Sequence, residues 1–176
     1  AKTAKVQVAQ PQGKTYAPSS DKILEEARTF LAEGKEADAE DRLRTLLIFE
    51  PNNPQALSLL GGIMYYSSRY QEAEMIFRKQ IQLDPDKAPL HNQLGSVLAK
   101  QDKITEAVAE CLKAVDLEPD SADARINLAG MYSVSGDRDN AMKQLIAAYK
   151  LIGYRILPFT HDSAFDKIRQ SPEFQE

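Results

Sequence analysis

Residues 54–87 read PQALSLLGGIMYYSSRYQEAEMIFRKQIQLDPDK, and residues 88–121 read APLHNQLGSVLAKQDKITEAVAECLKAVDLEPDS. The two stretches have equal length and place glycine, alanine and proline at the same offsets. Continued along the chain, the same 34-residue step connects Ala39, Ala73, Ala107 and Ala141, then Pro51, Pro85 and Pro119, and then Gly61, Gly95 and Ala129. A fixed period of this length is the sequence signature of a repeat architecture.

Each 34-residue period carries the pattern of two helices joined by a turn. We predict first helices over 21–33, 54–67, 87–100 and 122–134, and second helices over 36–49, 70–83, 104–117 and 138–152. Asn53 and Ser121 are placed to cap first helices, and Pro54 suits a first helical position. Gly34 and Gly136 mark the turns inside the first and last periods.

Apolar residues recur in two columns of the second helices, which predicts an inward face on every helix pair. The columns are Leu47, Ile81, Val115 and Tyr149, and Phe49, Leu83, Leu117 and Leu151. Because one helix pair cannot cover its own apolar face, the pairs are expected to stack on one another. Small residues such as Gly95 are expected where two helices approach closely, so Gly95→Leu should cost about 1–3 kcal/mol through overpacking.

These features resemble the tetratricopeptide repeat, a 34-residue helix–turn–helix unit with small residues and a closing proline. The resemblance implies an all-α fold, a right-handed α-solenoid of stacked antiparallel helix pairs. It divides the chain into a flexible lead (1–19), four units (20–53, 54–87, 88–121 and 122–155) and a C-terminal capping segment (156–176). The closing residues, DSAFDKIRQSPEF, resemble a segment that seals the last repeat in bacterial members of this family, with Phe165 and Ile168 spaced to bury one face.

In this family the first helices line a concave groove. The resemblance implies groove positions at Leu24, Arg28, Ser58, Gly62, Tyr65, Tyr66, Asn92, Ser96, Ala99, Arg125, Ile126, Asn127 and Gly130. Asparagine amides can donate to and accept from a peptide backbone, and tyrosines supply contact area with few rotatable bonds. For both tyrosines, packing against the next unit stays open as an equal alternative. Cochaperones of this family clamp a terminal carboxylate with lysine, asparagine and arginine side chains. At the matching positions of this chain only Arg28 could serve, so a chaperone-tail receptor is not expected.

No residue pattern for catalysis, metal binding or cofactor binding is present. The two histidines, His91 and His161, lack metal-ligand spacing; His91 is expected to pack or to line the groove, and His161 to cap or lie at the surface. Cys111, the only cysteine, falls where the other units carry Leu43, Phe77 and Leu145, so it is expected to replace a core hydrophobe. Signature motifs of acyl transfer and nucleotide binding are missing.

Composition is that of a globular protein, with 43% hydrophobic and 27% charged residues and a net charge of −4. No apolar run approaches the length of a membrane span, so membrane insertion is not expected. The first twenty residues hold three lysines and no acid, which leaves the remaining chain acidic and unsuited to phosphate. The compartment stays open between the cytoplasm and, if a signal peptide has been removed, the periplasm.

The sequence therefore predicts a non-enzymatic scaffold that binds a peptide or protein partner on the concave face of a superhelix. The alternative is an oligomerisation or regulatory module of a larger bacterial envelope or secretion assembly. An RNA-binding helical repeat ranks last, because the expected groove offers only Arg28 and Arg125 as cations. The expected state is a monomer or weak homo-oligomer without nucleic acid.

Overall fold

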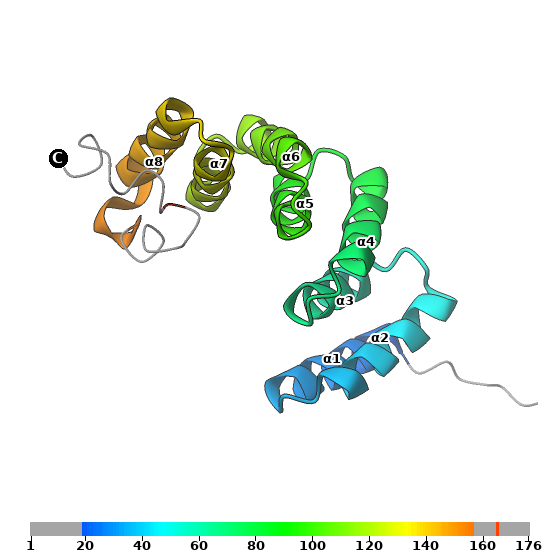
Figure 1. The fold of residues 1–176 in the computed structure, drawn as a ribbon. Helices are drawn as coiled ribbons and strands as arrows, with labels where there is room; N and C mark the ends of the chain where they lie inside the picture. Colours follow the sequence, from blue (N-terminus) through cyan, green and yellow to red (C-terminus); the bar gives the residue numbers. More distant parts are fainter. Residues whose placement is uncertain (1–18, 157–164, 166–176) are drawn as a thin grey trace, which may run out of the picture.

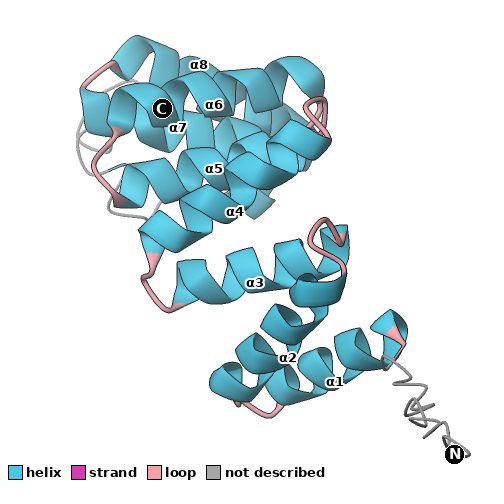
Figure 2. Cartoon of the chain, turned by 90° about the vertical axis from the view of Figure 1, so that its right-hand side faces the viewer, coloured by secondary structure: helices cyan, strands magenta, loops and turns pink. Residues whose placement is uncertain are grey.

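The computed structural model describes residues 19–156 and Phe165, and that part of the chain is helical without strands (Figure 2). The predicted second helices agree residue for residue with the structure, and the predicted first helices agree to within one residue at each end. The elements are α1 (Ser20–Ala32), α2 (Glu36–Phe49), α3 (Pro54–Tyr66), α4 (Tyr70–Leu83), α5 (Ala88–Lys100), α6 (Ile104–Leu117), α7 (Ala122–Ser135), α8 (Arg138–Ile152) and the 3₁₀ helix η1 (Gly153–Ile156).

Side-chain caps fix the start of most first helices. The Asn53 side chain accepts a hydrogen bond from the backbone N–H of Ala56 at 3.0 Å, and Ser121 accepts one from Ala124 at 3.4 Å, as the sequence predicts. Ser19 caps α1 in the same way. These oxygens satisfy backbone donors that have no partner inside the helix.

The turn inside each unit contains one residue with positive φ, and these residues recur every 34 positions. Gly34 and Gly136 have φ values of 72° and 86°, whereas the two central units place Ser68 and Asp102 there, at 59° and 62°. The next N–H closes the turn onto a carbonyl five residues earlier, as from Arg69 to Met64 at 2.8 Å. All four helix pairs therefore share one C-terminal turn geometry, although only two of them use the glycine that it favours.

The helix pairs stack into an arc (Figure 1). Each helix packs against its neighbours in sequence, with the most extensive contacts inside the pairs α5–α6 and α7–α8. The first helices α3, α5 and α7 lie on the inner side of the arc, and the second helices α4 and α6 lie on its outer side (Figure 1). The expected all-α solenoid of antiparallel helix pairs is confirmed.

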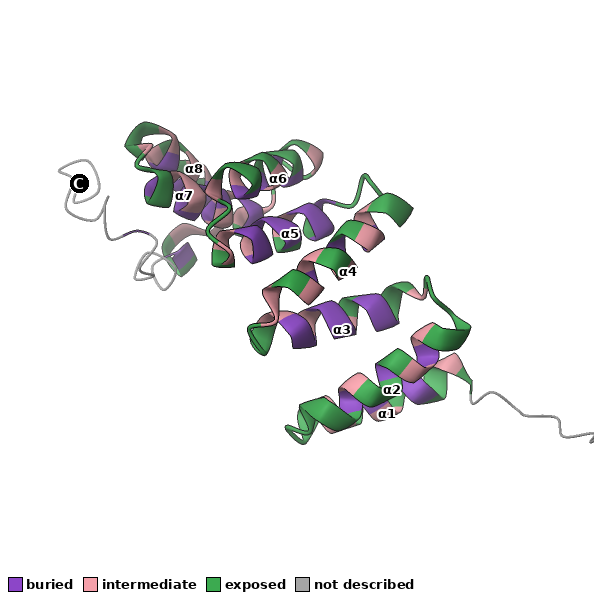
Figure 3. Ribbon diagram, turned by 45° about the vertical axis from the view of Figure 1, so that its right-hand side comes forward, coloured by how far each residue is buried: buried purple, intermediate pink, exposed green. Residues whose placement is uncertain are grey.

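A continuous spine of small and apolar residues joins the pairs, visible as buried stripes along the helices (Figure 3). Every member of the alanine column is fully buried. All four members of a second column, four residues further on, are buried as well: Leu43, Phe77, Cys111 and Leu145. Cys111 thus replaces a core hydrophobe, as predicted. His91 packs inside the core at 1% exposure.

One of the predicted apolar columns does not form the core. Phe49, Leu83 and Leu151 are 64%, 49% and 41% exposed, and Tyr149 of the other column is 45% exposed. Two positions along a helix turn a side chain by about 200°, so the Phe49 column cannot share a face with the Leu47 column. The prediction that both columns point inward was wrong, because apolar character alone does not identify which side of a helix has a neighbour.

Glycines on the first helices allow close approach of the second helices. A Cβ atom at Gly61 would lie 2.9 Å from the ring of Phe77, and one at Gly95 would overlap Sγ of Cys111 and lie 3.1 Å from the carbonyl oxygen of Ala107. The small residues of the 34-residue step therefore mark the tightest helix–helix contacts, as expected.

The end of η1 and Phe165 both contribute to the last core cluster. Ile156 and Phe165 are 5% and 2% exposed and pack with Ala141, Leu145 and Ala148 of α8. Phe165 thus lies in the core, consistent with its predicted burial. Ile168 and His161 lie outside the described residues.

Candidate functional site

Successive first helices bring one set of predicted groove residues together on the inner side of the arc. A cavity of about 310 Å³ opens between α3, α5 and α7. It is lined by Gly62, Tyr65, Tyr66, Phe77, Asn92, Gln93, Ser96 and Asn127. Six of these eight residues were predicted from the sequence, and three different units contribute them.

Gly62 leaves room for the cavity. A Cβ atom at Gly62 would meet no other atom within 4 Å, in contrast to the neighbouring Gly61. The two glycines of α3 therefore serve different surfaces, because one contacts α4 and the other opens onto the inner face. The ring of Phe77, 2% exposed, reaches the cavity from α4.

The two tyrosines of α3 differ in their surroundings. Tyr65 packs partly against the core and meets the rings of Tyr66 and Tyr70 edge-on, at centroid distances of 5.4 and 5.9 Å. Tyr66 is 81% exposed. The structure thus assigns Tyr65 a packing contact and leaves the ring of Tyr66 exposed, which the sequence alone could not decide.

Asparagines from two units are hydrogen-bonded to each other across the floor of the groove. The Asn127 amide nitrogen donates to Oδ1 of Asn92 at 2.9 Å and to Oγ of Ser96 at 3.3 Å. The Ser96 hydroxyl donates to the backbone carbonyl of Asn92 at 3.1 Å. These bonds fix both amides in place. The Asn92 amide nitrogen and Oδ1 of Asn127 have no hydrogen-bond partner within the part of the chain that the structure describes.

The other predicted groove residues lie outside this cavity. Leu24 and Ile126 are each 5% exposed, and Gly130 is buried, so they belong to the core and offer little surface. Three more are engaged within the protein: Ser58 accepts a hydrogen bond from Gln80, Ala99 packs against the core, and Arg125 donates to the carbonyl of Pro119 and to Gln144. Arg28 is exposed on α1.

Sequence reasoning missed two lining residues, Phe77 and Gln93. Gln93 lies 34 residues before Asn127, which was a predicted groove residue, so extending that prediction by one repeat would have included Gln93. Phe77 belongs to a second helix, α4, and its ring approaches α3 closely because Gly61 has no side chain there. No spacing rule for first helices would include it.

The titratable groups near the core are structural. His91 Nδ1 lies 2.7 Å from Glu110 and Nε2 lies 2.9 Å from the carbonyl oxygen of Pro85, so both ring nitrogens have partners. Burial, and to a lesser extent the charge of Glu110, raises the pKa of the Cys111 thiol to about 12. A thiol with such a pKa is a poor nucleophile at neutral pH. Within the described residues, no group of three metal-ligating side chains is found.

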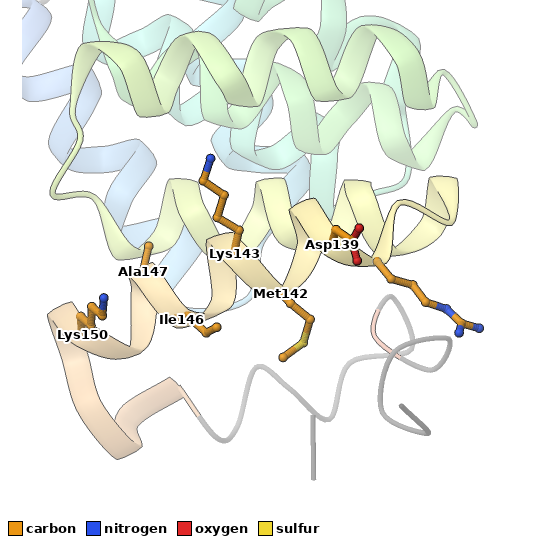
Figure 4. Close-up of a pocket in the computed structure, with 7 residues that line it drawn as sticks. Asp139, Met142, Lys143, Ile146, Ala147 and Lys150 are labelled. Carbon is orange, nitrogen blue, oxygen red and sulfur yellow. The ribbon is translucent and has the colours of Figure 1, made fainter. Parts of the chain in front are cut away.

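A larger hollow, of about 810 Å³, lies along the last helix. Its described lining residues all project from α8 (Figure 4): Arg138, Asp139, Met142, Lys143, Ile146, Ala147 and Lys150. A single helix at the end of the stack supplies all of these described lining residues. We therefore take the inner cavity, built by three units, as the candidate site.

The stacked pairs define a helical-repeat protein with a cavity on the inner side of the arc, built by three units. Two family models described as tetratricopeptide repeat match the chain, one over residues 24–88 and the other over residues 88–121. The chain belongs to the tetratricopeptide repeat family. No helix in the described part has the length and apolar character to span a bilayer.

Solved structures show the same fold. MamA from Desulfovibrio magneticus RS-1 superposes with a TM-score of 0.70 at 18% identity, over 74% of each chain. YrrB, described as a TPR protein with an unusual peptide-binding site, has a TM-score of 0.64 at 21% identity, over 74% of this chain and 67% of that one. A Thermobaculum terrenum O-GlcNAc transferase mutant has a TM-score of 0.67 at 24% identity, but only 25% of its length is covered. The comparison with curated proteins found no matching sequence.

Proposed function

We propose that this protein is a non-enzymatic scaffold that binds a segment of a peptide or protein partner in the inner cavity. The observation that carries the proposal is the cavity itself, in which three units converge and Tyr66 is left 81% exposed. An exposed aromatic ring beside oriented amides provides contact area and hydrogen bonding at low entropic cost.

Family membership supports the proposal, because tetratricopeptide proteins are typically protein-interaction modules. YrrB, a protein of the same fold, is described as having a peptide-binding site. The fold by itself does not determine a function, so the proposal depends on the residues of the cavity.

Affinity capture from a native lysate tests the proposal. Immobilised wild-type protein is compared with Tyr66→Ala/Asn92→Ala and with Gly62→Phe, which fills the cavity from a position where the backbone has room. Met75→Ala provides the matched control, since Met75 is 64% exposed on α4 of the outer side. We expect at least one captured protein to be lost with both cavity variants and retained with the control. Equal recovery of every captured protein by all four would overturn the proposal.

A further inference from the structure

We infer that the segment bound in the inner cavity is an uncharged, extended stretch of polypeptide. Its backbone is held by the Asn92–Asn127 pair, and an apolar side chain lies over Gly62 against Tyr66. This inference rests on the proposed function and specifies the chemistry of the ligand at that same site.

Charge selects against an ionised side chain. The eight lining residues carry amides, hydroxyls, aromatic rings and a glycine, with neither a carboxylate nor a lysine or arginine among them. Arg125, the predicted groove cation closest in sequence to the lining residue Asn127, already donates hydrogen bonds to the carbonyl of Pro119 and to Gln144. A charged ligand group placed in this cavity would lose part of its hydration without gaining a counter-ion, which is unfavourable.

Hydrogen bonding favours a backbone over a side chain. The hydrogen bond from Asn127 to Asn92 uses the nitrogen of the first amide and the oxygen of the second. The Asn92 nitrogen is left as a donor, and Oδ1 of Asn127 is left as an acceptor beside it. A peptide backbone presents the complementary C=O and N–H groups along an extended segment. Because Ser96 also accepts from Asn127, the orientation of the Asn127 amide is set before a ligand arrives.

The remaining wall suits an apolar side chain. Phe77 and Tyr66 supply aromatic surface to the cavity, and the missing side chain at Gly62 adds open space to it. At the equivalent position, one 34-residue step earlier, the first unit carries Arg28. The first unit therefore places a cationic side chain at the position where the second unit leaves open space.

The inference is tested with a phage-displayed library of random peptides, panned against the full-length chain and counter-selected against Gly62→Phe. Enriched peptides are synthesised, and their affinity is measured at low and high salt. We expect enriched sequences without charge at their centre, and an affinity that changes by less than about two-fold with salt, since no ion pair is screened. N-methylation of one central backbone nitrogen should weaken binding by about ten-fold, the loss of one well-made hydrogen bond.

Two variants extend the test. Asn92→Asp keeps the shape of the side chain and removes its donors, so it should also weaken binding about ten-fold. Gly62→Lys should lose the uncharged peptides and select acidic ones. Enrichment of charged, salt-sensitive peptides by the wild type, or binding unaffected by N-methylation at every position, overturns this inference and leaves the proposed function standing. If no peptide distinguishes the wild type from Gly62→Phe, the proposed function fails as well.

Discussion

Glycine at position 62 and glycine at position 95 both lie inside first helices, yet their surroundings are opposite. Gly62 faces the open inner cavity, whereas Gly95 is pressed against Cys111 and the backbone of α6. Glycine in a helix interior lowers stability by about 1 kcal/mol relative to alanine. It is the better residue only where the methyl group of alanine would clash with a neighbour. Only one of the two glycines is therefore required by packing.

Alanine substitution separates these two roles. We expect Gly62→Ala to stabilise the protein by about 0.5–1 kcal/mol through helix propensity. Gly95→Ala should instead destabilise it by about 1–2 kcal/mol, because overpacking exceeds the propensity gain. Urea unfolding followed by circular dichroism measures both free energies. Changes of the same sign would contradict the assignment of Gly95 to the helix–helix contact.

The turn residue Ser68 carries backbone strain that glycine would remove. Its φ of 59° lies in the left-handed region, where Gly34 and Gly136 stand at the equivalent positions. We expect Ser68→Gly to raise the free energy of unfolding by about 0.5–1 kcal/mol, because an L side chain is disfavoured there. Ser67→Gly is the control, since Ser67 has a φ of −81° and gains nothing from glycine. A thermal melt in which Ser67→Gly stabilises the protein as much as Ser68→Gly would count against strain at Ser68.

On the scale of the helices, charged residues link the second helices along the outer side. Glu40 and Arg44 of α2 form ion pairs with Arg69 and Glu72 at distances of 2.7–2.9 Å. One 34-residue step on, Glu74 and Arg78 repeat the arrangement with Lys103 and Glu106. A third step replaces these residues with Val108, Leu112, Asp137 and Asn140. The first two junctions thus have an ionic link that the third lacks.

Glu74 lies at the centre of the second link and gives it a defined pH dependence. Burial opposes ionisation of this carboxyl, but hydrogen bonds from Lys103, Arg78 and Gln101 outweigh it and lower the pKa of Glu74 to about 2. A carboxyl whose pKa is lowered by folding stabilises the folded state above its ordinary pKa, and this contribution is lost as pH falls toward 2. Glu74→Gln should therefore lower the melting temperature at pH 7.

The difference between wild type and Glu74→Gln should shrink as pH falls below about 4.5. The exposed Glu25 of α1 provides the matched variant Glu25→Gln, for which we expect a smaller effect at pH 7. Thermal melts across this pH range measure both. A constant difference between wild type and Glu74→Gln at every pH would show that the variant acts through something other than charge.

The two ends of the helix stack differ in the polarity of their outer faces. On α1, the positions equivalent to Leu60 and Ile63 of α3 are occupied by Glu26 and Thr29, so this end is polar. On α8, Met142, Ile146 and Tyr149 stand where α6 carries Val108, Leu112 and Val115. Val108 and Val115 belong to a cluster that packs against α7. The outer face of α8 therefore has the composition of an internal stacking face.

We propose that the C-terminal segment 156–176 is a cap for this face, as its sequence predicts. The burial of Phe165 beside α8 supports the proposal. Deleting residues 157–176 should lower the free energy of unfolding by about 2–4 kcal/mol, comparable to truncating one large core side chain. It should also expose apolar surface and produce concentration-dependent association in light scattering.

The full chain is the control for this deletion, and we expect it to remain monomeric over the same concentrations. A deletion variant with unchanged stability would contradict the capping role. Concentration-dependent association of the full chain itself would instead favour the oligomerisation alternative.

The helices and their closest contacts follow from the sequence because they depend on local pattern. Proline, asparagine and glycine at fixed offsets determine where helices begin and end. Asn53, for example, caps the start of α3, and Gly136 caps the end of α7. The groove was predicted only in part, since six of its lining residues were named while Leu24 and Ile126 proved to be core. Those two residues share a repeat position with Asn92, and the packing of neighbouring helices, not the position number, decides which of the three is accessible.

The 34-residue step is written in the sequence, and it predicts four antiparallel helix pairs, because each step brings small residues back to the same helix–helix contact. Three features are visible only in the folded chain: Tyr66 is exposed, Gly62 leaves open space, and the Asn127 amide is hydrogen-bonded to Asn92. These outcomes depend on the angle at which one unit meets the next. That angle is set by many side chains packed together, and no single position in the chain encodes it.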